Sequence, residues 1–250
     1  MRTRQFILVV SLLIVVALES IWAASKAPLA DAVMGQDHAT AVTLLRGGAD
    51  VNAAQGDGMT GLHWAARHGH YALAALLLDA GANTEAATRI GDHRPLHVAS
   101  RGGQAQIVEM LLEAGADPNL ASTAGATPLY AALNMEWSPK SRHPQPTDYR
   151  QQKHSYLEVM EILLSAGVDP NPRLKKSLWF TTYNRDLFGV DRTGATPFWR
   201  AAHALDIKAM KLLLTYGANP DLPTIKRPSR RYRYDITDEQ ALPSVDASGL

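Results

Sequence analysis

Short stripes of apolar residues recur along the chain at helical spacing. In residues 105–112, four apolar side chains follow the i, i+1, i+4, i+5 spacing that places them on one face of a helix. They are Ile107, Val108, Leu111 and Leu112. Residues 156–164 and 206–214 repeat this design. The pattern predicts short amphipathic helices whose apolar faces form the core of the fold.

These stripes belong to a longer unit that recurs with a period of about 33 residues. Glycines that follow the predicted helices lie 33 residues apart from Gly48 to Gly81, and 34 apart from Gly81 to Gly115. The clearest copy of the unit reads Thr60-Gly61-Leu62-His63-Trp64-Ala65-Ala66, Gly69-His70, Leu76-Leu77-Leu78 and Gly81-Ala82-Asn83. A fixed period indicates stacked units that bury their apolar faces against their neighbours.

The repeated motifs closely resemble those of the ankyrin repeat family. The first motif returns at Pro95-Leu96-His97-Val98-Ala99, Thr127-Pro128-Leu129-Tyr130-Ala131-Ala132 and Thr196-Pro197-Phe198-Trp199-Arg200-Ala201-Ala202. The closing motif returns at Gly48-Ala49-Asp50, Gly115-Ala116-Asp117 and Gly217-Ala218-Asn219, with Gly167-Val168-Asp169 as a variant. The resemblance implies an all-α solenoid of helix-turn-helix repeats, joined by short β-hairpin or loop connections. Five copies begin near Pro28, Gly61, Pro95, Pro128 and Pro197.

Composition agrees with one folded repeat domain, which we assign to residues 25–222. Hydrophobic residues make up 46% of the chain and charged residues 20%, as in ordinary globular proteins. The first repeat is irregular, because Gln36 stands where the family has glycine and Ala30 where it has histidine. We therefore expect this repeat to act as an N-terminal cap.

The N-terminal residues 1–24 have the order of features of a secretory signal peptide. Arg2 and Arg4 precede an apolar run over residues 6–18, and small residues follow at positions 23–25. The run is shorter than the 18 or more residues of a membrane-spanning helix. The sequence thus predicts an exported protein, periplasmic or secreted. Without this segment the net charge falls from +1 to zero, so no general attraction to nucleic acid or membrane is expected.

Retention of the same segment is the alternative. Cleavage after Ala23 would leave Ile21 at a position that normally holds a small residue. An uncleaved residue 1–24 segment would make the protein a membrane-tethered, extracytoplasmic scaffold.

Two insertions interrupt the period. The first covers about residues 136–155, is rich in proline and lysine or arginine, and is expected to be an extended loop. The second covers about residues 172–189 and carries aromatic residues beside cations. Its aromatic candidates for partner contact are Trp179, Phe180 and Tyr183. Aromatics and arginine favour an interface, but they also suit a cover for an irregular repeat junction. The sequence leaves both interpretations open.

Residues 223–250 form a basic, irregular tail or a truncated third insertion. The stretch 226–234 interleaves cations with tyrosine, which also suits single-stranded nucleic acid, although an exported protein is not expected to meet it. The same region favours a further alternative, in which this chain is the N-terminal binding part of a longer protein whose C-terminal region carries an activity.

The family's binding surface is usually built from hairpin tips and exposed first-helix positions, and the resemblance carries both onto this chain. The first-helix candidates are Arg67, His68, Arg101 and His203, and the hairpin candidates are Asp57, Met59, Ile90, His93, Arg192 and Thr193. Arg67 and Arg101 occupy neighbouring repeats and together favour an acidic patch on a protein partner.

Motifs for catalysis or cofactor binding are not found. The chain has no nucleophile elbow, phosphate-binding loop, dinucleotide fingerprint or His-Glu-x-x-His motif, and no cysteine. In the family, the imidazoles at His63 and His97 hydrogen-bond to the backbone and tie turns together, which argues against a metal site. We therefore expect a protein-protein interaction module that needs no cofactor or metal and is not an enzyme.

Overall fold

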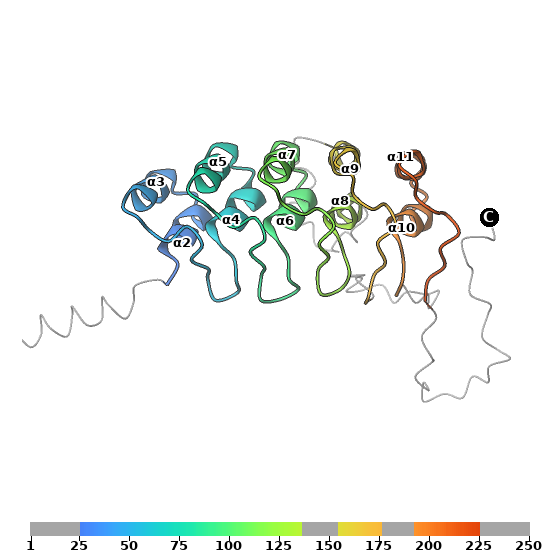
Figure 1. The fold of residues 1–250 in the computed structure, drawn as a ribbon, viewed down its shortest axis with the longest axis horizontal. Helices are drawn as coiled ribbons and strands as arrows, with labels where there is room; N and C mark the ends of the chain where they lie inside the picture. Colours follow the sequence, from blue (N-terminus) through green and yellow to red (C-terminus); the bar gives the residue numbers. More distant parts are fainter. Residues whose placement is uncertain (1–25, 137–154, 177–192, 226–250) are drawn as a thin grey trace, which may run out of the picture.

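Paired helices alternate between two rows in the computed structural model, which describes residues 26–136, 155–176 and 193–225 (Figure 1). The first helices of the repeats are α2 (Pro28–Met34), α4 (Gly61–His68), α6 (Pro95–Arg101), α8 (Pro128–Glu136) and α10 (Pro197–His203). The second helices are α3 (His38–Arg46), α5 (Tyr71–Asp79), α7 (Ala105–Glu113), α9 (Tyr156–Ser165) and α11 (Ile207–Thr215). The predicted helix-pair solenoid is confirmed.

The first helices begin at the residues that the repeated motif marks. Proline occupies the first turn of α2, α6 and α10, where its missing N–H costs no hydrogen bond. The Thr196 hydroxyl caps α10 by accepting from the Trp199 N–H at 3.1 Å. Helices of seven to ten residues are too short to be stable alone, so the array depends on packing between them.

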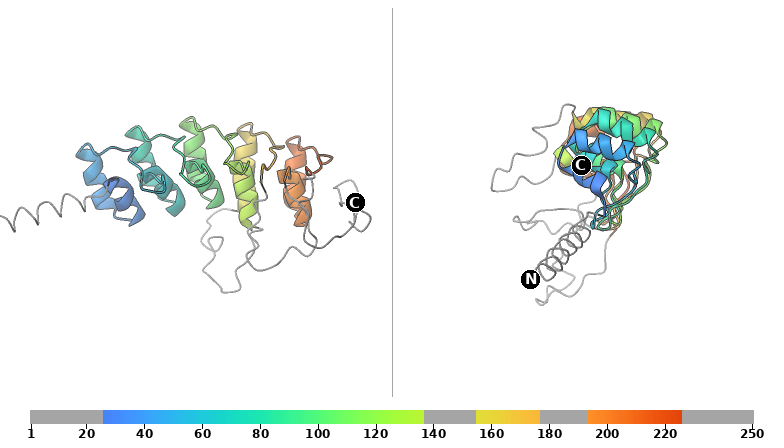
Figure 2. Two further views of the ribbon diagram at one scale, coloured as in Figure 1. Left: turned by 90° about the horizontal axis from the view of Figure 1, so that it is seen from below. Right: turned by 90° about the vertical axis from the view of Figure 1, so that its left-hand side faces the viewer.

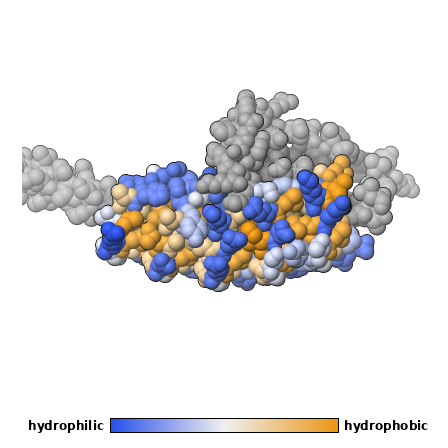
Figure 3. Space-filling view, turned by 90° about the horizontal axis from the view of Figure 1, so that it is seen from above, coloured by the Kyte–Doolittle hydropathy of each residue, from blue (hydrophilic) through white to orange (hydrophobic). Residues whose placement is uncertain are grey.

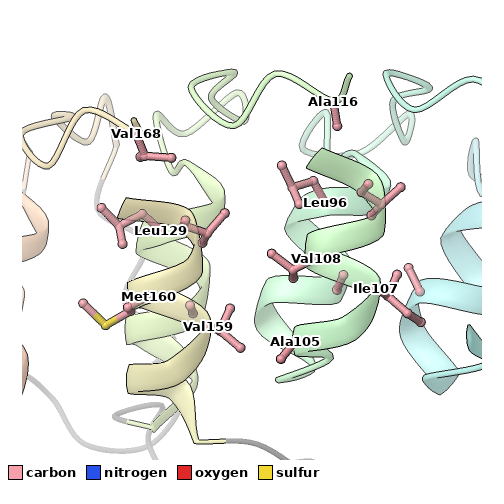
Figure 4. Close-up of a cluster of buried hydrophobic side chains, with 14 of the residues drawn as sticks. Leu96, Ala105, Ile107, Val108, Ala116, Leu129, Val159, Met160 and Val168 are labelled. Carbon is pink, nitrogen blue, oxygen red and sulfur yellow. The ribbon is translucent and has the colours of Figure 1, made fainter. Parts of the chain in front are cut away.

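One continuous apolar core runs between the two rows of helices. Figure 4 shows its central part, where side chains of α6, α7, α8 and α9 meet between the third and fourth repeats. Val108, Leu111 and Leu129 are fully buried there. The apolar stripe predicted for residues 105–112 faces this core, except that Leu112 is only partly buried. Each layer of the core lies between two neighbouring repeats, and each of the two contributes part of it. A repeat therefore needs its neighbours to bury its apolar side chains.

Hairpin-shaped loops join the repeats on one side of the array (Figure 1), and the described residues form no β-strands in them. Backbone hydrogen bonds link each loop to the next. They run from the N–H of Arg89 to Asp57, of Thr123 to Gly91, of Lys175 to Ala124 and of Ile225 to Thr193, at 2.7–3.0 Å. These bonds fix the loops in register, so their side chains form one continuous edge.

The predicted second insertion needs a correction at its start. Leu174 is buried, and its N–H donates to the Ala195 carbonyl at 3.1 Å, as in the base of a loop of the repeated kind. Residues 172–176 therefore belong to the repeat, and only the part beyond Lys176 interrupts it. The aromatic candidates Trp179, Phe180 and Tyr183 lie outside the described residues, as do most of the first insertion, the N-terminal segment and residues 226–250.

The turn between the two helices of a repeat requires a left-handed residue. Gly69 and Gly103 fill this position with φ of 70° and 66°. Gln36 and Leu205 fill it in the first and fifth repeats with φ of 59° and 57°, which L side chains rarely adopt. The irregularity predicted at Gln36 is thus a strained turn, and the helix pair forms around it.

Seen along its axis, the array presents its repeats nearly superimposed (Figure 2). Successive repeats therefore bring equivalent positions of the first helices and loops side by side. Within the described parts of the chain, no helix combines the length and the apolar character needed to span a bilayer.

Candidate protein-binding groove

A groove of about 640 Å³ lies where the loops meet the first helices of the first four repeats. Its lining includes seven of the residues predicted for partner contact. They are Asp57, Met59, Arg67, His68, Ile90, His93 and Arg101. Since these residues come from two loops and two helices, the groove exists only because the repeats stack in register.

Two arginines from neighbouring repeats line the groove and are both exposed. The Arg67 guanidinium carbon lies 5.6 Å from the centre of the Trp64 ring, a cation-π distance that orients the side chain. The Trp64 ring is held in turn by its N–H, which donates to the Gln55 side-chain oxygen at 2.8 Å. Among the described residues, neither Arg67 nor Arg101 forms an ion pair, so both charges are available to a partner.

The loop between the second and third repeats supplies an apolar and a titratable side chain. Ile90 is 82% exposed at its tip. His93 is half-buried below it, and burial lowers the pKa of its ring, as does the charge of Arg101, whereas Asp92 raises it. His93 is therefore neutral at pH 7 and offers hydrogen bonding in place of charge. Asp57 is exposed in the preceding loop.

Two predicted contact residues turn out to be interior. The side chains of Met59 and Thr193 are each 8% exposed. Met59 lies under its loop, where its N–H donates to the Asp57 carboxylate at 2.9 Å and its carbonyl accepts from Gln55. The Thr193 carbonyl accepts from the Ile225 N–H. Both residues support the loops, and neither offers much surface to a partner.

Of the remaining predicted positions, only His203 is described, and it does not line the groove. His203 is exposed at the end of α10, where its ring stacks on Trp199 at 5.1 Å. Arg192 is outside the described residues.

The predicted structural role of His63 and His97 is confirmed. His63 Nδ1 bonds to the Thr60 backbone N–H at 3.2 Å, and its Nε2 pairs with the His93 carbonyl at 3.0 Å. His97 pairs its Nε2 with the Ala126 carbonyl, also at 3.0 Å. Burial lowers the pKa of both rings, that of His97 to about 4. Each neutral imidazole therefore ties a first helix to the next loop along the array.

Aromatic residues replace this histidine in the last two repeats. Tyr130 and Trp199 are buried in a second apolar cluster with Leu174, Ala126 and Ala195. This apolar cluster occupies the place of the imidazole hydrogen bonds that His63 and His97 make in the second and third repeats. The groove lining ends at Ala131, where this change begins.

Several groove residues were not predicted from the sequence. Gln36, Thr88, Val98, Gln104 and Ala131 line the groove, besides Gly102, which follows Arg101 at the end of the first helix, and besides His97 and its partner Ala126. Gln104 precedes α7 and reaches across to the backbone of Gly69 in the repeat before it, leaving no room for a side chain there. Its position just before a second helix is the only signal in the sequence that could have pointed to it.

The opposite side, formed by the second helices, has a mixed surface. Figure 3 shows polar and apolar side chains interspersed along it. Tyr71 and Leu76 on α5 are about half exposed, while α7 and α9 present glutamates. Within the described residues, no three histidine or carboxylate side chains are placed to hold a metal ion.

Comparison with known proteins agrees with the repeated geometry. Residues 29–122 match the family model described as ankyrin repeats, in three copies. No curated protein matches the chain. The matched range covers the first three helix pairs, α2 to α7, and most of the groove. The same helix pair and the same loop bonds continue through α11.

Proposed function

We propose that this protein is a non-catalytic interaction module that holds its partner in the groove. Ankyrin repeats, of which the chain is built, generally bind other proteins. The observation that carries this proposal is the pair of exposed arginines on neighbouring repeats, Arg67 and Arg101, beside the exposed Ile90. An acidic partner segment with an apolar side chain complements this arrangement. The stacked repeats hold these groups in place before binding, so little ordering free energy is lost.

Charge reversal tests the proposal. We expect crosslinked capture of a partner by the intact chain and its loss in the double variant Arg67→Glu/Arg101→Glu. A matched control is Lys208→Glu/Lys211→Glu, which changes the net charge equally on the exposed face of α11. Circular dichroism shows whether each variant is folded. Equal capture by both folded variants would refute the groove as the binding site.

Export is the second part of the proposal and is supported by the charge and apolar pattern of residues 1–24. The mature N-terminus, read by mass spectrometry after cell fractionation, tests it. A chain that begins near residue 24 in the extracytoplasmic fraction supports secretion. An intact N-terminus in the membrane fraction favours the tethered scaffold. Ile21 also favours it, because a cleavage site normally has a small residue at that position. An intact chain in the cytoplasm would refute both.

A further inference from the structure

Three histidines from the first two repeats meet beside one end of the groove. His38 begins α3, His68 ends α4, and His70 precedes α5. The rings of His38 and His70 are 4.6 Å apart between centres, and those of His68 and His70 are 5.7 Å apart. We call these residues the histidine cluster. Its contact between the rings of His38 and His70 joins the first repeat to the second.

One ring nitrogen of His68 and one of His70 are buried without a hydrogen-bond partner in the part of the chain that the structure describes. The Nε2 atoms of His68 and His70 are both buried, and neither forms a hydrogen bond with the described residues. His68 also stacks on Trp64 at 5.7 Å with the rings nearly parallel. A second proton on either ring would place a charge beside a buried Nε2 atom that has no hydrogen-bond partner among the described residues, which is unfavourable.

The charges around the cluster oppose protonation as well. Burial lowers the pKa of His68, the charge of Arg67 on α4 lowers it further, and a hydrogen bond with the Met34 backbone raises it. Burial lowers the pKa of His70, and His38 and His68 lower it further. Asp37 interacts electrostatically with His38. The other charged groups on the surrounding helices do not act on His68 or His70; they are Asp31, Arg46, Asp79, Arg94 and Arg101.

We propose that the histidine cluster is a pH-dependent latch, which holds the first repeat on the second when the rings of His68 and His70 are neutral and releases it when they are protonated. Above pH 6.5 the rings of His68 and His70 are neutral whether the junction is closed or open, so the latch is closed. As the pH falls, the open junction binds protons first, because its rings have ordinary pKa values, and opening becomes more favourable. Among the described residues the first repeat packs chiefly on the second, so it can open without unfolding the rest.

Release of the first repeat changes the groove. Gln36 of the first repeat and His68 of the latch both line it. Opening removes Gln36 from the groove and frees His68 from its stacked position on Trp64. The part of the inference that concerns partner binding rests on the function proposed above. The opening of the junction itself does not.

Hydrogen exchange of the full chain tests the latch without a partner. We expect that, between pH 7.5 and pH 5.5 and after correction for intrinsic exchange, residues 28–46 gain at least tenfold more opening than residues 156–165 of α9, which contain no histidine. The variant His38→Gln/His70→Gln should lose this difference. His97→Gln, which removes a buried imidazole outside the latch, should keep it. An equal gain in both segments, or the same difference in His38→Gln/His70→Gln, would overturn the proposal.

A second measurement does not depend on any variant. NMR titration of the ring protons in the intact chain should give values below 6.5 for His68 and His70, with the midpoint of the change in exchange at the same pH. Ordinary values for both rings would overturn the latch. Loss of partner capture at pH 7.5 in Arg67→Glu/Arg101→Glu bears on the proposed function alone, so the two ideas fail separately.

Discussion

Replacement of His97 by glutamine should reduce the sensitivity of the fold to acid. The imidazole lies in the interior at 3% exposure, and its Nε2 pairs with the Ala126 carbonyl, 29 residues away in the next loop. Glutamine still offers an N–H to that carbonyl but does not titrate. At pH 7.5 we expect the variant to be less stable by about 1–2 kcal/mol, because one hydrogen bond of less suitable geometry replaces another.

The difference in pH dependence follows from the pKa of the ring. Burial lowers the pKa of His97 from 6.5 to about 4 in the folded chain. Between these two values the unfolded chain binds a proton that the folded chain does not, so the free energy of unfolding falls as the pH falls. Between pH 7.5 and pH 5 this single residue should remove about 2 kcal/mol, since each pKa unit corresponds to about 1.4 kcal/mol.

Urea denaturation at a series of pH values, followed by circular dichroism, measures both effects. The intact chain should lose about 2 kcal/mol more than His97→Gln between pH 7.5 and pH 5, and the two should change in parallel above pH 7.5. Burial lowers the pKa of His63 as well. Because His63 remains in both proteins, its effect cancels in the comparison. Parallel curves down to pH 5 would show that the His97 ring is not held neutral by burial, and the reasoning would be wrong.

Two further predictions concern backbone geometry. Leu205→Gly should raise the free energy of unfolding by about 1 kcal/mol, because the backbone of Leu205 is in the left-handed region and its side chain is 79% exposed. A lower unfolding midpoint in thermal denaturation would contradict this. Gly58→Ala should lower the free energy of unfolding more than Gly81→Ala does, although both glycines have a left-handed backbone. A Cβ at position 58 would lie 2.6 Å from the Arg89 nitrogen, whereas one at position 81 meets nothing within 4 Å. Equal losses of unfolding free energy in the two variants, measured by urea denaturation, would show that the loop can shift to accommodate the Cβ without loss of stability.

Much of the fold could be predicted because its signals are local. The Thr-Pro pair before a first helix, the paired alanines within it and the glycine after the second helix each act within one turn of the chain. For this reason the starts of α8 and α10 coincide with the predicted motif. The roles of His63 and His97 followed from the family motif, which repeats the same bond in each unit.

The candidate site was predicted in part. Arg67 and Arg101 were identified because equivalent positions of neighbouring repeats must lie side by side. Met59 was expected at the surface, since its place in a loop says nothing about the chain that packs over it. Burial of Thr193 depends likewise on the following loop, whose Ile225 lies 32 residues further on.

The sequence alone determined the helix starts and the apolar stripes, because these depend on residues close together in the chain. It also determined the period, which is the spacing at which these local signals recur. Only the tertiary structure decided the walls of the groove, the contribution of Gln36 and Gln104 to it, and the meeting of the rings in the histidine cluster. These features join residues of different repeats, and their distances depend on how closely neighbouring helices pack. Tyr130 shows the same limit: it stands in the position of His97, yet its burial with Leu174 and Trp199 depends on a loop that begins about 40 residues later.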